Sequence, residues 1–186
     1  MPKLEVPPSE ALYPVPVVLV SCLDREAGRA NIITIAWCGI VASNPPLVSI
    51  SIRPSRHSHK LITREREFVV NIPHSKLLPE TDFCGIHSGS QVDKFKHCKF
   101  TAVQASKIGA PMIGECPVNI ECRLNSVLKL GSHDMFIAEV VSVHTDSNIL
   151  NAGGVIDYGR AEPFVFNRGE YWDLGKKIGS YGRSSK

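Results

Sequence analysis

The chain has 186 residues, 43% of them hydrophobic and 21% charged, and its formal net charge is +3. This length is typical of one domain with a sizeable core, so we expect a single domain over residues 1–186. The basic residues are scattered, whereas nucleic-acid-binding proteins carry a strongly basic face, so we expect no nucleic acid partner. No apolar run reaches the roughly 18 residues of a membrane span, and residues 1–8 contain no hydrophobic signal region. We therefore expect no membrane partner and a cytoplasmic location.

The cysteines predict free thiols. They form no Cys-x-x-Cys pair, and isolated cysteines in the cytoplasm are normally reduced, so we expect no disulfide framework. One combination, Cys84, His87, His97 and Cys98, contains the ligand types of a tetrahedral zinc site. His97 and Cys98 are adjacent, however, and adjacent side chains point apart on a helix or strand. We therefore predict no metal site. The six cysteines are Cys22, Cys38, Cys84, Cys98, Cys116 and Cys122.

The first third of the chain predicts strands followed by a helix. Residues 15–22 have the apolar composition of a buried strand, and residues 24–29 predict a hairpin turn into a strand that begins at Asn31. Residues 47–53 alternate apolar and polar side chains with the period of a half-buried strand. A turn then leads into a helix over residues 58–66, with Ser55 or Ser58 as the candidate N-cap.

The rest of the chain predicts more strands than helices. Residues 68–72 return to a strand, residues 76–86 are helical around Pro79, and residues 92–97 form a short helix. Residues 119–130 and 135–144 alternate, are rich in β-branched side chains, and are joined by a tight turn, which predicts an antiparallel hairpin. Strands of this kind favour a barrel, because closure removes exposed edges. We expect residues 148–158 and the segment from Gly169 onward to be irregular.

A candidate anion site follows the strand over residues 47–53. Ser49, Ser51 and Arg53 share one face if the alternation holds, and the planar fork of an arginine suits a phosphate. The helix that follows would add its N-terminus, which favours anions. The alternative is that Arg53, Arg56 and Lys60 only decorate a solvated turn, which is the usual role of a basic cluster.

A second candidate site lies in residues 82–95. Small residues precede a short helical pattern there, and the backbone amides of residues 88–90 and the ammonium of Lys94 are available to an anion. Glycine allows close approach because it lacks a Cβ atom. The alternative is an ordinary surface loop.

Together these segments resemble the flavin reductase-like FMN-binding split barrels, and within that family the flavoredoxin-like branch. The resemblance covers nearly the whole chain. It implies a mainly β fold, an antiparallel Greek-key split barrel with a few short peripheral helices, and FMN as the cofactor. It also implies a homodimer with the flavin near the subunit boundary. The segments that carry it are residues 14–21, 31–37, 45–53, 68–72 and 84–95.

The resemblance also implies roles for individual residues. Asn31, Thr34, Arg53 and Lys94 would hold the phosphate and the ribityl chain of FMN. Cys84 would be a flavin-loop residue, with a buried structural thiol as the alternative. Trp37 would be a wall of the cofactor slot, although core packing is the ordinary role of a tryptophan. The other residues expected to line the site are Ala36, Ser51, Ile52, Ser58, Ser88 and Gly89.

The expected activity follows from the cofactor. The flavin carries the electrons, and hydride transfer to its N5 atom needs no dedicated base, so we assign no catalytic residue. The chain has no Gly-x-Gly-x-x-Gly motif, so NADH or NADPH would bind only transiently as the electron donor. We expect an NAD(P)H-dependent flavin reductase. One alternative is a flavoredoxin-like electron carrier with a redox protein partner, and another is a non-redox binding module. Trp172 would pack in the core or at an interface, which is the ordinary role of a tryptophan, or Tyr171 to Gly175 would fold over the flavin of the same or a neighbouring subunit.

Overall fold

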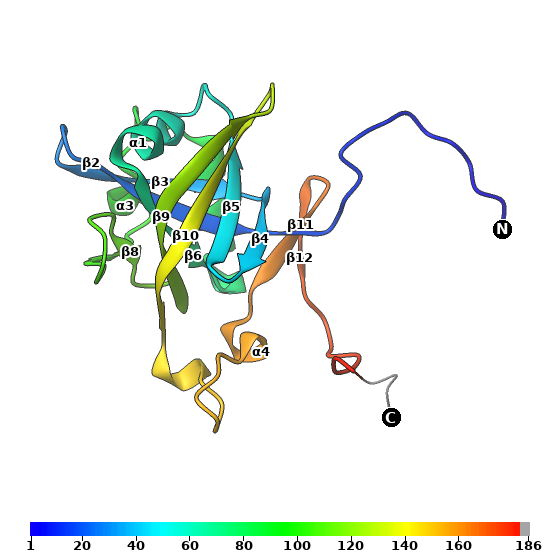
Figure 1. Ribbon diagram of the computed structural model, residues 1–186. Helices are drawn as coiled ribbons and strands as arrows, with labels where there is room; N and C mark the ends of the chain where they lie inside the picture. Colours follow the sequence, from blue (N-terminus) through cyan, green and yellow to red (C-terminus); the bar gives the residue numbers. More distant parts are fainter. Residues whose placement is uncertain (183–186) are drawn as a thin grey trace.

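A computed structural model describes residues 1–182 and contains one large antiparallel sheet with short helices around it (Figure 1). The strand order is β3-β2-β6-β9-β10-β5-β4. The prediction of a mainly β antiparallel barrel with a few peripheral helices is therefore confirmed. The seven strands are β2 Val18–Asp24, β3 Arg29–Ile35, β4 Cys38–Ser43, β5 Pro46–Ile52, β6 Glu67–Ile72, β9 Val118–Lys129 and β10 Asp134–Thr145.

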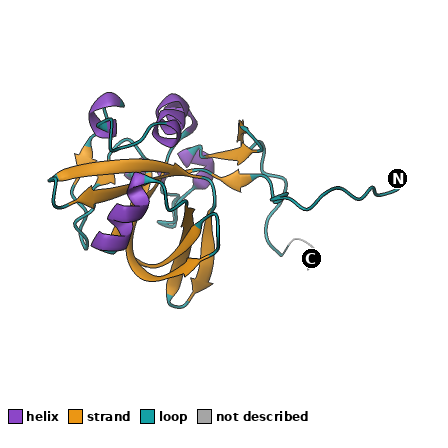
Figure 2. Cartoon of the chain, turned by 90° about the horizontal axis from the view of Figure 1, so that it is seen from above, coloured by secondary structure: helices purple, strands orange, loops and turns teal. Residues whose placement is uncertain are grey.

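The sheet curls so that its two edges approach each other. β3 ends at Ile35 and β4 begins at Cys38, yet these two strands are the opposite edges of the sheet. Only Ala36 and Trp37 connect them, so the edges must come together at this point. The Ser51 amide of β5 donates to the Trp37 carbonyl at 2.8 Å, which holds this two-residue connection against β5. Figure 2 shows the curved strands, with the helices on the outside.

Alternation along β2 separates two hydrophobic clusters. Val18, Val20 and Cys22 face the barrel interior, where they pack with residues that include Phe68 and Phe136. Leu19 faces the opposite side and packs in a second cluster beneath α2 and α3. Helix α1 contributes to the barrel interior through Leu61 and Ile62, because its apolar positions fall on one face.

The helices are short, and the first begins at an unexpected residue. α1 starts at His57 with Arg56 as its N-cap, and no side chain caps it. The prediction of Ser55 or Ser58 as the cap is wrong, because Ser58 lies inside the first turn and its hydroxyl bonds to Asn31 instead. The helices are α1 His57–Glu65, η1 Ser75–Leu77, α2 Leu78–Ile86, α3 Lys94–His97, η2 Ser147–Ile149 and α4 Tyr158–Ala161.

Several strands were not predicted from the sequence patterns, among them β4, β11 and β12. β4 is a partly exposed edge strand without clear alternation. β12, Glu170–Asp173, lies in the segment predicted to be irregular, and it forms a hairpin with β11, Phe164–Asn167. β11 pairs on its other side with β1, Val15–Pro16, so this small sheet depends on a partner from the far end of the chain. A further two-stranded sheet joins β7 Ala102–Val103 and β8 Met112–Ile113.

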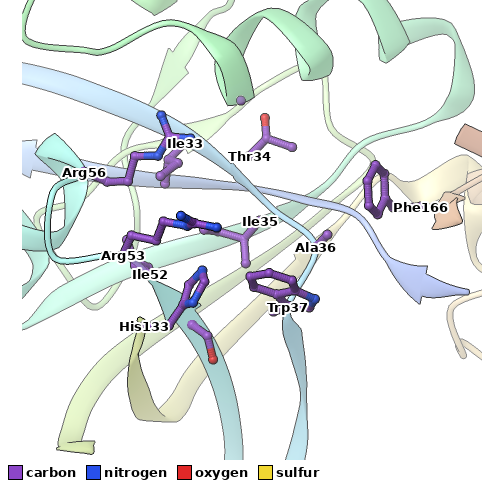
Figure 3. Close-up of a pocket in the computed structure, with 12 residues that line it drawn as sticks. Ile33, Thr34, Ile35, Ala36, Trp37, Ile52, Arg53, Arg56, His133 and Phe166 are labelled. Carbon is purple, nitrogen blue, oxygen red and sulfur yellow. The ribbon is translucent and has the colours of Figure 1, made fainter. Parts of the chain in front are cut away.

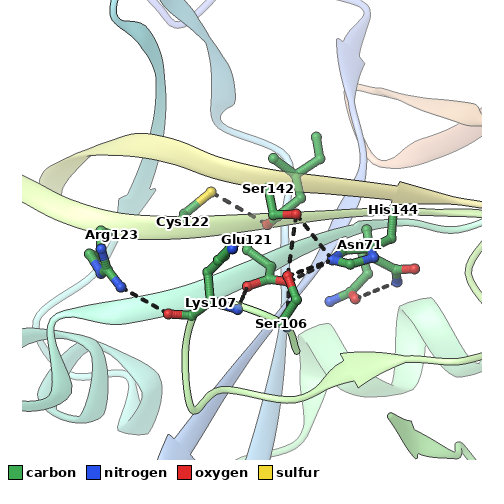
Figure 4. A network of polar contacts seen from close by, with 10 residues as sticks. Asn71, Ser106, Lys107, Glu121, Cys122, Arg123, Ser142 and His144 are labelled. Atoms are coloured by element: carbon green, nitrogen blue, oxygen red, sulfur yellow. Dashed lines mark hydrogen bonds and ion pairs between the residues drawn. The ribbon is translucent and has the colours of Figure 1, made fainter. Parts of the chain in front are cut away.

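A buried carboxylate fastens the 104–110 loop to the long hairpin (Figure 4). The Glu121 side chain of β9 is fully buried and accepts hydrogen bonds from the amides of Ser106 and Lys107, both at 2.7 Å. The Ser106 hydroxyl and the His144 ring also contact it, at 2.8 and 2.6 Å. Burial alone would raise the pKa of Glu121, but these donors lower it to about 2.

No helix within residues 1–182 is long and apolar enough to cross a membrane.

Candidate functional site

The main pocket lies where the two edges of the curled sheet meet (Figure 3). Its volume is about 210 Å³, and it is open to solvent on one side. Figure 3 shows Arg53 and Arg56 at one end and Phe166 at the other, with Trp37 and His133 along one wall. The lining residues are Ile33, Thr34, Ile35, Ala36, Trp37, Ser51, Ile52, Arg53, Arg56, Gly85, His133 and Phe166.

Aromatic and cationic groups form the wall of this pocket. The Trp37 and His133 rings meet edge to face with centroids 4.5 Å apart. Burial, and secondly the charge of Arg53, lower the pKa of His133, which favours its neutral imidazole. Arg53 has no ion pair with any residue in the described part of the chain. The wall therefore offers flat ring surface beside an available guanidinium.

A smaller hollow adjoins the main pocket at the N-terminus of α1. The two share Ile33, Arg56 and Gly85, so they form one continuous site. The N-terminus of a helix presents backbone N–H groups and a positive dipole, and an anion is stabilised there. The hollow is lined by Ile33, Arg56, His57, Ser58, Gly85, His87, Ser88, Gly89 and Lys94.

Lys94 is a buried ammonium at this hollow. Only 2% of the residue is exposed, and its Nζ atom donates to the carbonyls of Ile32 and Cys84, both at 2.7 Å. Burial lowers its pKa, and no carboxylate lies within 4 Å of Nζ among residues 1–182. A lysine has three N–H donors, so one is left for another acceptor. A buried charge without a counter-charge is costly, and an anionic ligand in the hollow would offset that cost.

Gly89 brings the backbone of the second loop against β3. A Cβ atom at this position would lie 1.7 Å from Oδ1 of Asn31, so no larger residue fits. The Arg29 guanidinium donates to the Gly89 carbonyl at 2.9 Å, which holds the loop in place. Asn31 also donates through Nδ2 to the Ser58 hydroxyl at 2.7 Å, while its Oδ1 is buried without a hydrogen-bond partner. Asn31 thus contacts both Gly89 and Ser58, which line the hollow.

Most of the predicted residues meet at this site. Asn31 lies behind the lining, and Arg53 faces the main pocket together with Trp37, not the hollow that contains Lys94. The predicted residues in the main pocket are Thr34, Ala36, Trp37, Ser51, Ile52 and Arg53. Those in the smaller hollow are Ser58, Ser88, Gly89 and Lys94.

Cys84, like Asn31, is a predicted residue that does not line either part of the site. Its side chain is fully buried in the cluster beneath α2 and α3, where it packs with Leu19 and Ile32. One residue later on the helix, Gly85 faces the pocket and packs against Thr34. Successive helical side chains point about 100° apart, so the two residues cannot share a face. The side chain of Cys84 therefore does not line the pocket, and it matches the alternative of a buried structural thiol.

Several lining residues were not predicted, among them Gly85, His133 and Phe166. Gly85 sits between predicted residues, but its contact with Thr34 is visible only once α2 is placed on β3. His133 belongs to the turn between β9 and β10, and Phe166 belongs to β11. Neither has a local sequence signal, because each reaches the pocket through pairing with a distant strand. Trp172 is largely exposed and its ring N–H donates to Glu170, while the neighbouring Tyr171 hydroxyl donates to Asp82 of α2.

The residues of the zinc alternative do not converge on a point. The rings of His87 and His97 stack on Phe83, at centroid distances of 4.0 and 3.8 Å. Within residues 1–182 no group of three or more histidine, cysteine, aspartate or glutamate side chains could hold a metal ion.

Comparison with known proteins agrees with this geometry. Residues 10–175 match the sequence model of the flavin reductase like domain. The chain belongs to this family. It is 31% identical to flavoredoxin of Desulfovibrio vulgaris (Miyazaki F), with a TM-score of 0.92 over 99% of this chain and 100% of that one.

Two further proteins are informative. A flavin reductase with a split barrel domain from Shewanella frigidimarina superposes with a TM-score of 0.81 over 90% of this chain and 85% of that one, at 21% identity. The NADH:riboflavin 5'-phosphate oxidoreductase of Streptomyces pristinaespiralis is 28% identical over 130 residues, which are 70% of each chain. The predicted family and the split-barrel fold are therefore confirmed.

Proposed function

We propose that this protein binds FMN in the continuous site between the sheet edges. The observation that carries the proposal is Lys94, a buried ammonium with no carboxylate within 4 Å in residues 1–182, at the end of a slot lined by aromatic rings. FMN combines a phosphate with a flat ring system, so it matches both ends of such a site. Gly89 lets the loop backbone lie directly against Asn31, so the loop that lines the hollow is held close to β3. These features fit FMN better than a simple anion.

The two parts of the site would bind different parts of FMN. Lys94, Arg56 and the N-terminal amides of α1 would hold the phosphate, because they surround the smaller hollow. Trp37 and His133 would form one wall for the ring system, and Arg53 would lie beside it. A guanidinium next to the ring stabilises negative charge that develops on reduction.

We further propose an NAD(P)H-dependent flavin reductase activity. Bound flavin supplies the hydride-accepting chemistry, and the residues of this chain orient it and leave one face open. A shallow depression of about 450 Å³ adjoins the main pocket through Trp37, Ser51, Arg53 and His133. It offers room for a nicotinamide that binds transiently. The similarity to an NADH:riboflavin 5'-phosphate oxidoreductase supports this activity.

Anaerobic stopped-flow spectroscopy tests the activity. Protein loaded with FMN is mixed with NADH or NADPH, and the absorbance of oxidised flavin is followed. A reductase bleaches rapidly with at least one nicotinamide and turns over with added free FMN. Absence of bleaching with both donors would refute the reductase assignment.

An electron carrier is the second candidate function. It is favoured by the similarity to flavoredoxin, which extends over nearly the full length of both chains. A carrier retains FMN through purification, reacts slowly with nicotinamides, and is reduced by a redox protein partner such as a ferredoxin-type donor. Flavin retention and reduction by the protein donor therefore separate the two functions.

We also propose a homodimer in a cytoplasmic setting. β4 is an edge of the sheet, and it exposes Ile40 and Val41, while β10 exposes Val143. Exposed apolar residues on a sheet edge are typical of surfaces that pair with another chain. All six cysteines are free thiols, as a reducing compartment favours.

A further inference from the structure

Two thiols beside the anion hollow lie in direct contact. The Sγ atoms of Cys84 and Cys98 are 3.8 Å apart. Cys84 lies on α2 and is fully buried, whereas Cys98 directly follows α3 and is only half-buried. Cys116 belongs to the same hydrophobic cluster. Cys98 lies fourteen positions after Cys84, so a bond between them would join α2 to the C-terminal end of α3.

We propose that Cys84 and Cys98 form a redox-active thiol pair that a peroxide converts to a reversible disulfide. A disulfide needs an S–S distance of about 2.05 Å, so the sulfurs must approach by roughly 1.8 Å. Short helices that are not otherwise cross-linked can accommodate such a shift. The pair has one sulfur near solvent, where an oxidant arrives, and one behind it that can resolve the product.

The chemistry balances with hydrogen peroxide as the oxidant. The Cys98 thiolate attacks one peroxide oxygen, which breaks the O–O bond and gives a sulfenic acid and hydroxide. The Cys84 sulfur then attacks the Cys98 sulfur, the S–S bond forms, and the sulfenic oxygen leaves as water. Overall two thiols lose two electrons and two protons, and one peroxide becomes two waters. Burial raises the pKa of both thiols, so the first step is slow at pH 7 and faster at higher pH.

The bond would act on the proposed FMN site, and this consequence rests on the proposed function. The Cys84 carbonyl accepts a hydrogen bond from Lys94, and Gly85 lines the pocket. The Thr34 hydroxyl of β3 donates to the Thr81 carbonyl of α2, so α2 is held against β3 and has little freedom to move. The helix that carries Lys94 must therefore take up most of the shift. We expect the disulfide to weaken FMN binding several-fold.

Peptide mapping tests the bond without reference to flavin. The full-length protein is treated with hydrogen peroxide at pH 8, blocked with an alkylating agent, and digested without reductant. The expected product is a peptide pair that joins Cys84 to Cys98, has lost two hydrogens, and is separated by dithiothreitol. Cys98→Ser should abolish this pair, while the matched control Cys116→Ser should keep it. A map without the pair, or one that joins Cys84 to Cys116 in the natural protein, would overturn the proposal.

Two further measurements keep the test decisive. In Cys84→Ser the resolving sulfur is missing, so dimedone should label Cys98 as a sulfenic acid. An unlabelled Cys98 would contradict its role as the attacking thiol. FMN titration of reduced and oxidised protein then measures the coupling, and equal dissociation constants would overturn it. Failure of the reduced protein to bind FMN would instead refute the proposed function, while the peptide map would still decide the disulfide.

Discussion

In the proposed FMN site, Lys94 is the group that would select an anionic ligand for the smaller hollow. Its two hydrogen bonds to the Ile32 and Cys84 carbonyls fix Nζ in place, so the ammonium is rigid before any ligand arrives. A preorganised charge binds an anion with little loss of side-chain entropy. Because no carboxylate competes for it within residues 1–182, the charge is available to the ligand.

Replacement of Lys94 tests this role. A hydrogen bond to a charged group contributes about 1.5 to 3 kcal/mol, so Lys94→Met should weaken FMN binding about 10- to 100-fold. Lys96→Met removes an exposed charge from the same helix and should leave the affinity almost unchanged. Fluorescence titration with FMN compares the variants. Equal affinities for the two would show that the buried ammonium does not contact the ligand.

Gly89 is a second position with a sharp steric expectation. Gly89→Ala would place Cβ 1.7 Å from Asn31 Oδ1, so Asn31 must move and lose its bond to Ser58. We expect the free energy of unfolding to fall by more than about 1 kcal/mol and FMN binding to weaken. At Gly39 a Cβ meets nothing within 4 Å, so Gly39→Ala should change stability by less than about 0.5 kcal/mol. Urea denaturation measures both, and similar losses would contradict the steric account.

The residues that the sequence could predict are those with local patterns. Ser51 and Arg53 follow from alternation in one strand, and Gly89 and Lys94 follow from a small-residue loop before a helix. The side chain of Cys84 points away from the pocket, and a resemblance between sequences does not specify which way a helical side chain turns.

Glu121 connects two elements of the fold, because it joins the 104–110 loop to the β9–β10 hairpin. Its pKa of about 2 lies below the ordinary value of 4.5. A carboxyl group whose pKa is lower in the folded than in the unfolded protein stabilises the folded state at pH values above its ordinary pKa. This stabilisation is lost as the pH falls through the folded-state pKa. The loop should therefore be held firmly at neutral pH and released in acid.

Glu121→Gln tests the loop attachment. The Ser106 and Lys107 amides donate to different oxygens of the carboxylate, and glutamine has only one side-chain oxygen. One backbone N–H therefore loses its acceptor, and we expect a loss of about 2 kcal/mol at pH 7. The difference from the natural protein should shrink below about pH 4.5 and vanish near pH 2. Glu139→Gln on β10 changes an exposed carboxyl and is the matched control. Urea midpoints measured from pH 7 to pH 2 check this, and a difference independent of pH would contradict it.

Elements with strong periodicity were predictable, and short ones were not. β9, β10 and β5 alternate clearly, and the apolar face of α1 marks that helix. β4 and β12 have few buried positions, and β12 is part of a sheet completed by β1 from the other end of the chain. Local patterns contain no information about such a partner.

The site as a whole depends on the curl of the sheet. Ile33 to Ile35 and Ser51 to Ile52 lie on strands at opposite sides of the pocket, and only closure brings them together. The β9–β10 turn then adds His133, and the C-terminal hairpin adds Phe166. The sequence supported a barrel, but the meeting of these four segments became visible only in three dimensions.

The proposed dimer makes a prediction about the intact molecule. Ile40 is 86% exposed on the edge strand β4, which is unfavourable for an isolated monomer. Sedimentation at micromolar concentration should give twice the chain mass of 20.4 kDa. Ile40→Asp should shift the protein towards monomer while its circular dichroism spectrum stays unchanged. A natural protein that sediments as a monomer would refute the dimer.

The most direct test of the FMN site compares FMN with riboflavin, which lacks only the phosphate. Both are titrated into the reduced protein while flavin fluorescence is followed. If Lys94, Arg56 and the α1 N-terminus hold the phosphate, FMN should bind at least about 100-fold more tightly, a difference of about 2.7 kcal/mol. Equal affinity for the two flavins, or no binding of either, would contradict the account.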